Sequence, residues 1–282
     1  MNIIWLKNST IDSTGNGLIE IFPSALIRPV IARAGDLIIG QRCSLSGRAV
    51  SWAYKSGVHL FITSNGAAKL QAWLPVDASG DNAAARQIVA SNTPHVIDEV
   101  ARWMLARRFG KILHPAHGIN VVRGYEGVQV RQIYKKLAAE YGIEWDGRKT
   151  TGKWDSLTPI NKTISICNSA LYGLTEIAII HAGYSPYFGF MHGHSGKALV
   201  YDIADMIKFE HVTPIAFRIV ADGRPNPEWR ARAACARLFR RCSLLRELIT
   251  LTEETMNAAF TSLATKPPRR RRKNLPGYMA KN

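Results

Sequence analysis

Candidate metal ligands, foremost His192, Asp202 and Asp205, occur in the stretch from Phe188 to Glu210, FGFMHGHSGKALVYDIADMIKFE. Asp202 and Asp205 are three residues apart, so their carboxylates share one face if the segment is helical. His192 precedes them across a short glycine-containing loop. Acids and an imidazole beside apolar residues are costly to bury without a positive partner, which favours a divalent cation. The alternative is a solvated helix face on which Asp205 pairs with Lys208. This stretch alone leaves both interpretations open.

A third acid, Glu126, precedes a segment whose apolar residues recur at helical spacing. If that helix begins near Gly124, Glu126 lies at the top of the buried stripe and needs a partner there. The simpler interpretation is a first-turn glutamate that interacts favourably with the helix dipole. Taken together with His192, Asp202 and Asp205, Glu126 is better explained by a common metal site.

The charge balance points to a polyanionic ligand. The 282 residues include 37 Lys and Arg against 21 Asp and Glu, a formal net charge of +16. We therefore expect nucleic acid as the first candidate and an anionic membrane as the second. Four cysteines without a Cys-x-x-Cys pair argue against a zinc knuckle and fit the reduced thiols of a cytoplasmic protein. We expect no membrane span and no signal peptide, because no sufficiently long apolar run is evident.

The chain changes character near residue 76. Residues 1–75 contain short β-branched runs separated by turn residues, which predicts a small β-rich domain. Residues 76–81, VDASGD, are typical of a linker, and residues 82–264 show helical spacing and predict a larger all-α catalytic domain. The expected fold class is therefore α+β. Residues 265–282 contain KPPRRRRK and predict a basic disordered tail.

Several elements are predicted within these regions. The pattern favours helices over 46–55, 82–109 with a break near Pro94, 128–141, 158–182, 228–247 and 251–263, and a hairpin turn at Asn65–Gly66.

Three motifs in this order, RGYEG, YGLTEIAIIHAGYSPYFGFMHG and VYDIADMIKFE, closely resemble the CRISPR-associated integrase of type I-E systems. That protein is the larger subunit of the complex that captures new spacers. The resemblance covers roughly Ala101 to Arg246 and continues more weakly into the β-rich part. It implies a small β-rich domain followed by a helical domain with a metal site, in agreement with the spacing of the residues.

By this resemblance the metal ligands are Glu126, His192 and Asp205, and Asp202 is an auxiliary acid of the same site. Carboxylate oxygens favour Mg²⁺, and a single histidine also suits Mn²⁺. The implied activity is a metal-dependent DNA endonuclease and integrase, which inserts short foreign DNA fragments as new spacers by transesterification. His194 is a local departure from the family pattern.

The resemblance also implies the partners: double-stranded DNA, as the captured fragment and as the repeat, a second copy of the chain, and a small ferredoxin-like CRISPR-associated protein. The candidate DNA contacts are Arg42, Lys69, Arg123, Arg131, Lys197, Arg230 and Arg232. The main alternative function is a non-catalytic basic scaffold that binds DNA. A zinc hydrolase lacks its His-Glu-x-x-His helix here, and an RNA-binding protein lacks an aromatic RNP motif.

Only tertiary packing can unite the implied ligands, because Glu126 lies 66 residues before His192. We expect the Glu126, His192 and Asp205 groups to lie within about 8 Å of one another even without metal, with Asp202 beside them. Because acids gathered without an ion repel each other, at least one of them should have a raised pKa.

The tail yields a stability prediction. Residues 266–282 offer little apolar surface and four consecutive arginines, so their deletion should leave the melting temperature within about 1–2 °C of the full chain. Thermal unfolding of both proteins measures this difference. A much larger decrease would mean that the tail packs on the body of the protein.

Overall fold

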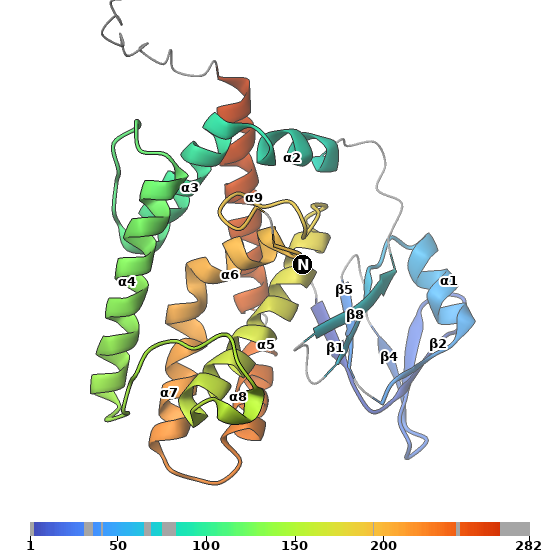
Figure 1. Ribbon diagram of the computed structural model, residues 1–282. Helices are drawn as coiled ribbons and strands as arrows, with labels where there is room; N and C mark the ends of the chain where they lie inside the picture. Colours follow the sequence, from blue (N-terminus) through green and yellow to red (C-terminus); the bar gives the residue numbers. More distant parts are fainter. Residues whose placement is uncertain are drawn as a thin grey trace, which may run out of the picture.

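The computed structural model describes residues 3–30, 36–40, 42–64, 69–74, 83–193, 195–240 and 243–265. Its N-terminal part is β-rich and the remainder is helical (Figure 1), which confirms the α+β class. The expected Asn65–Gly66 turn, the linker 76–81, His194 and the tail from residue 266 lie outside the described residues. The exact domain boundaries stay a prediction.

The described N-terminal residues form two four-stranded sheets. The strands are β1 (Ile3–Leu6), β2 (Thr10–Ser13), β3 (Leu18–Ile21), β4 (Ile27–Val30), β5 (Asp36–Ile39), β6 (Ser44–Leu45), β7 (Leu60–Ser64) and β8 (Lys69–Leu74). The first sheet has the order β1-β5-β7-β8, with β1, β5 and β7 parallel and β8 antiparallel. The second has the order β4-β3-β2-β6. Strands β2 and β6 were not predicted, because β2 (TIDS) has one large apolar residue and β6 has two residues in all, so neither shows a clear apolar pattern.

The helix predicted over 46–55 is present as α1 (Gly47–Lys55). The side chain of Ser46 accepts a hydrogen bond from the amide of Ala49, as expected of a helix N-cap. Ala49 and Ala53 on its buried face contact the core that α1 shares with the two sheets.

Alternate residues of the central strands join the β-rich part to the helices. On β5, Leu37 and Ile39 pack in the core between the sheets, whereas Ile38 packs in the helical core. On β7, Leu60 packs in the core between the sheets, and Phe61 packs in the helical core. Successive side chains of a strand point to opposite faces, so the first sheet is covered on both faces.

The described helical part begins with α2 (Ala83–Ser91), α3 (Pro94–Phe109) and α4 (Ile119–Glu140), followed by a 3₁₀ turn η1 (Trp154–Ser156), and continues with α5 (Pro159–His181), α6 (Ala198–His211), α7 (Thr213–Ala221), α8 (Pro227–Phe239) and α9 (Ser243–Ala264). The predicted break near Pro94 separates α2 from α3, and the predicted helix 158–182 corresponds to α5.

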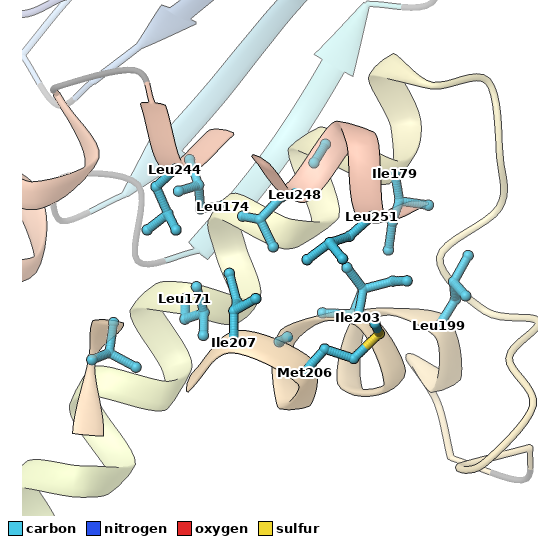
Figure 2. Packing of buried hydrophobic residues seen from close by; sticks show 14 of the residues in the cluster. Leu171, Leu174, Ile179, Leu199, Ile203, Met206, Ile207, Leu244, Leu248 and Leu251 are labelled. Atoms are coloured by element: carbon cyan, nitrogen blue, oxygen red, sulfur yellow. The ribbon is translucent and has the colours of Figure 1, made fainter. Parts of the chain in front are cut away.

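Helix α5 lies at the centre of this part, where it contacts α6, α7, α8, α9 and β8. Figure 2 shows the packing of its residues Leu171, Leu174 and Ile179 with side chains of α6 and α9. Contrary to our expectation, α5 is long and apolar enough to cross a membrane, but 78% of its most apolar window is buried inside the protein. Burial of most of its residues is typical of such a core helix.

The break predicted between residues 247 and 251 is wrong. Helix α9 is continuous from Ser243 to Ala264, and α8 ends earlier, at Phe239. Apolar residues recur on both sides of either position, and neither has a glycine or proline to mark it. Helix α7 was not predicted. It follows α6 after Val212 and has a proline in its first turn, a position where proline is well tolerated.

One fully buried side chain connects α2 to the loop that leads toward His192. The Nε2 of Gln87 donates hydrogen bonds to the carbonyl oxygens of Ser185 and Phe188, each at 2.8 Å, and its Oε1 accepts one from the Ser185 amide at 2.8 Å. The side-chain amide of Gln87 therefore satisfies three backbone hydrogen-bonding groups of this loop in place of water.

The Gln87→Ala variant should lower the free energy of unfolding by roughly 1–3 kcal/mol, because it leaves buried backbone groups of the loop without partners. Chemical denaturation measures this loss. The control is Gln132→Ala at an exposed position of α4, which should change stability by less than about 0.5 kcal/mol. Equal effects of the two variants would contradict a role for Gln87 in holding the loop.

Candidate active site

The Asp202 carboxylate lies at the centre of the candidate site. Its Oδ2 accepts hydrogen bonds from the amides of Phe190 at 2.5 Å and Met191 at 3.1 Å. Its Oδ1 accepts from the His192 amide at 3.0 Å and from the His192 Nδ1 at 2.7 Å. The side chain of Asp202 is fully buried, so it does not belong to a solvated helix face.

These contacts define what Asp202 can do. A carboxylate offers about four lone-pair sites, and donors within the described residues occupy them. Asp202 is therefore a positioning residue that orients the ring of His192. Because Nδ1 points to the carboxylate, Nε2 is the nitrogen left to bind an ion. The predicted role of an auxiliary acid is compatible with this arrangement.

Gly189 permits the close approach of this loop to α6. A Cβ at this position would lie 2.6 Å from the Asp202 Oδ2, 2.6 Å from the carbonyl carbon of Ala198 and 2.7 Å from the Leu199 nitrogen. No larger residue fits there without moving the backbone, so the glycine is required for the hydrogen bonds to Asp202.

The other two acids are each paired with a cation. Glu126 forms an ion pair with Arg108 of α3, and Asp205 forms one with Lys208 at 2.8 Å. The Asp205–Lys208 pair was expected only for a solvated face, yet both side chains are at most 13% exposed. Arg108 was not predicted, because nothing in the sequence distinguishes it from other arginines near a helix end.

Glu126 does not lie in a first helical turn. Helix α4 begins at Ile119 rather than near Gly124, so Glu126 is in its third turn and the helix-dipole interpretation is wrong. The glycines within RGYEG lower helix propensity. For this reason the sequence pattern predicts a helix start that is too late in the chain. Helix α3 packs against α4, which allows Arg108 to reach Glu126.

One small cavity is lined by Glu126, His192, Asp202 and Asp205. Arg108 and apolar side chains, including Met104, Met191 and Met206, form the rest of its described wall. Its volume is about 10 Å³, which is space for roughly one water molecule or one small ion. The structure therefore brings the four predicted residues together from α4, α6 and the loop between α5 and α6.

The donor set of this cavity fits a hard divalent ion. Asp205 Oδ1 is buried and has no hydrogen-bond partner within the described residues. Two carboxylates and one imidazole are ligands that Mg²⁺ and Mn²⁺ accept. Two other groups of acids and histidines in the described part of the chain have ligand atoms within 4.8 Å of one another, but the ligands of this cavity do not form such a group. Metal binding would therefore require Arg108 and Lys208 to release the acids.

The pKa values of the site reflect these pairs. Burial raises the pKa of Asp205, but the charges of Lys208 and Arg108 outweigh it, so the pKa is lowered overall. The expectation of a raised pKa is thus wrong for Asp205, because two cations replace the ion. Burial lowers the pKa of His192, but the hydrogen bond to Asp202 and the surrounding acids outweigh this, so the pKa is raised.

Three of the predicted DNA contacts have protein partners in this structure. Arg123 donates to the carbonyl oxygen of Met191, which holds the loop beside His192. Lys197 donates to Glu176 of α5 at 2.7 Å. Arg230 forms an ion pair with Asp222. These cations have structural partners in the free protein, which sequence spacing did not reveal.

The remaining four predicted contacts lie on different elements. Lys69 begins β8 and Arg131 lies on α4, and both are exposed. Arg42 is exposed at a left-handed backbone position after β5 and lines a cavity between the β-rich and helical parts. Arg232 is half-buried on α8.

Comparison with known proteins identifies the family. A family model described as "CRISPR associated protein Cas1" matches residues 90–228. The "CRISPR-associated endonuclease Cas1 3" of Methanospirillum hungatei is 34% identical in an alignment 277 residues long, which covers 93% of this chain and 91% of that protein. This chain belongs to the Cas1 family. The similarity to Cas1 extends over both the β-rich and the helical parts.

Two further Cas1 proteins support this result. The "CRISPR-associated endonuclease Cas1" of Escherichia coli is 42% identical over 161 residues, which is 57% of this chain and 53% of that protein. A solved structure described as "Crystal structure of TtCas1-DNA complex" has a TM-score of 0.81 and 27% identity, and the match covers 91% of this chain and 96% of that chain.

The role of Asp202 can be tested by Asp202→Asn, which keeps the size of the side chain but removes its charge. We expect a loss of roughly 1.5–3 kcal/mol in the free energy of unfolding, because hydrogen bonds to a charged group are lost. The ¹⁵N chemical shifts of His192 should also show a ring that has lost its fixed tautomer.

Asp155→Asn, at an exposed site, is the matched control and should affect neither measurement. If Asp202→Asn lowered stability but left the His192 shifts unchanged, Asp202 would hold only the loop and not the ring.

Proposed function

We propose that this Cas1 protein is a metal-dependent DNA endonuclease and integrase, which inserts short foreign DNA fragments as spacers into a CRISPR repeat array. The observation that carries the proposal is the cavity on which Glu126, His192 and Asp205 converge. The net charge of +16 supports a DNA substrate. The similar TtCas1 protein has been solved as a complex with DNA, which adds support.

In this proposal Glu126, Asp205 and the His192 Nε2 hold one Mg²⁺ or Mn²⁺ ion. When bound, the ion supplies Lewis-acid stabilisation of charge on the phosphoryl oxygens during transesterification. Asp202 keeps the His192 ring in one orientation and accepts its Nδ1 proton in a hydrogen bond. The methionine side chains in the wall make the surroundings of the cavity less polar, which strengthens electrostatic interactions there.

Arg108 and Lys208 supply positive charge at the site. Without an ion, they compensate the charges of Glu126 and Asp205 and make the burial of both acids possible. Once released from the acids, their side chains would lie beside the reacting phosphate and contribute positive charge there.

The proposed partners follow the motif resemblance. They are double-stranded DNA, a second copy of the chain and a small ferredoxin-like CRISPR-associated protein, in a cytoplasmic type I-E adaptation complex. Four of the proposed phosphate contacts have no structural partner described above, namely Arg42, Lys69, Arg131 and Arg232. Arg123, Lys197 and Arg230 would have to exchange a protein contact for DNA.

A second candidate function is a basic scaffold that binds DNA without catalysis. The two ion pairs favour it, because an acid that is neutralised by arginine or lysine needs no metal. An assay of strand joining with the purified protein, its partner, a short DNA fragment and a repeat-bearing plasmid separates the two functions. The scaffold predicts no joining with Mn²⁺, whereas the integrase predicts joining that EDTA abolishes.

In the same assay, Asp205→Ala should abolish strand joining and leave DNA affinity within a few fold of the wild type. The reason is that the proposed ion lies at one point, whereas phosphate contacts spread over the surface. DNA affinity of both proteins should fall by about tenfold or more between low and physiological salt. Circular dichroism verifies that the variant is folded.

The matched control is Glu140→Gln at an exposed position of α4, which should join DNA at the wild-type rate. A folded Asp205→Ala protein that lost DNA binding together with joining would contradict the separation of binding from chemistry.

A further inference from the structure

A second group of ligand residues lies where the first sheet meets α5. Asp36 is the first residue of β5, and His59 directly precedes β7. Because β5 and β7 are parallel neighbours, their first residues meet at the same edge of the sheet. His181 is the last residue of α5, which ends at this edge. Three segments far apart in the sequence therefore supply one cluster.

The contacts in this cluster are close. The Nδ1 of His59 lies 2.9 Å from the Asp36 Oδ1, and the Nδ1 of His181 lies against the Asp36 Oδ2. One ligand atom from each residue lies within 4.8 Å of the ligand atoms of the other two. The two imidazole rings are 5.7 Å apart at an angle of 69°. Both rings thus direct a nitrogen at the same carboxylate.

The Asp36 carboxylate is the shared partner of both rings. Its Oδ2 and the His181 Nδ1 are buried and form a close ion pair, whose geometry is not that of a well-directed hydrogen bond. An ion placed between the three side chains would replace this contact and bind a donor atom of each residue.

The donor atoms of this cluster indicate which kind of metal ion would fit. Two neutral imidazoles and one carboxylate suit Zn²⁺ and similar transition ions, whereas Mg²⁺ and Ca²⁺ prefer oxygen ligands. Tetrahedral Zn²⁺ with ligand bonds of about 2.0–2.1 Å places its donors roughly 3.3 Å apart. The present spacing needs only a small outward movement of the rings. His59 and His181 are 20% and 18% exposed, which leaves access for a water as fourth ligand.

We propose that Asp36, His59 and His181 form a binding site for a divalent transition ion of the zinc class. The ion connects the edge of the first sheet to the C-terminal end of α5. None of the three residues lines the described wall of the candidate active site, so the proposal does not depend on the proposed function. Because the ion binds the folded chain, it stabilises the junction between the β-rich and helical parts.

The chain offers a matched control. Glu210, His211 and Glu247 also bring their ligand atoms within 4.8 Å of one another, but Glu210 is exposed and the group has one histidine. The His211 Nε2 is 3.1 Å from Glu247. Two carboxylates and one imidazole suit zinc less well than two imidazoles and one carboxylate, so this group should bind zinc more weakly.

The test uses the full chain after removal of metal with EDTA. Zinc affinity is measured by competition with a chromophoric chelator in the presence of excess Mg²⁺, and the melting temperature is measured with and without zinc. We expect one tight site, whose affinity falls at least about tenfold in His59→Gln and in His181→Gln. The affinity should be unchanged in His211→Gln and in Asp205→Asn.

Zinc should also raise the melting temperature of the wild-type protein but not that of His59→Gln. His59 is partly exposed and lies outside the strands, so His59→Gln keeps the test available if His181→Gln does not fold. Equal zinc affinity of wild type and a folded His59→Gln would overturn the proposal. Loss of tight binding in His211→Gln or Asp205→Asn would assign the ion to another site and would overturn it as well.

Discussion

The site depends on one buried carboxylate. The side chain of Asp202 is fully enclosed, so its charge is stable only because amides of the loop and the His192 ring donate to it. The same hydrogen bonds fix the backbone from Phe190 to His192. The hydrogen bonds that offset the electrostatic cost of burying the Asp202 charge therefore also position the His192 ring. Gly189 makes the arrangement possible, since a side chain there would collide with the carboxylate.

The cations of the site follow from the same constraint. Glu126 and Asp205 border an apolar cavity, so each needs a positive partner when no ion is bound. Arg108 and Lys208 provide it from α3 and α6. The acids that line the cavity thus have basic side chains beside them, and the pKa of Asp205 is lowered rather than raised.

The sequence predicted those parts of the molecule that depend on local pattern. The helices predicted over 46–55 and 158–182 and the break near Pro94 each depend on residues a few positions apart, and each is present. The motif resemblance named four residues that line one cavity. The contacts of Arg108 and Gln87 could not be predicted, because their partners lie 18 and about 100 residues away and no pattern marks them.

The four expected residues of the site are not held equally firmly. The loop with His192 is fixed by Gln87, Arg123 and Asp202, and Lys197 at its end is paired with Glu176 of α5. Glu126 depends on α4, which lies at the outer edge of the helical part (Figure 1) and buries only Val122, Tyr134 and Ala138 fully among its described residues.

Helix α4 also exposes apolar side chains on the turns around Glu126. Val121, Tyr125 and Val128 are each about 40% exposed, at 41%, 39% and 42%. A helix with so little buried surface can shift at a lower cost than α5 or α6, whose apolar faces are enclosed. In the proposed integrase, releasing Glu126 from Arg108 by a shift of α4 would therefore disturb less packing than a shift of α6, which carries Asp205.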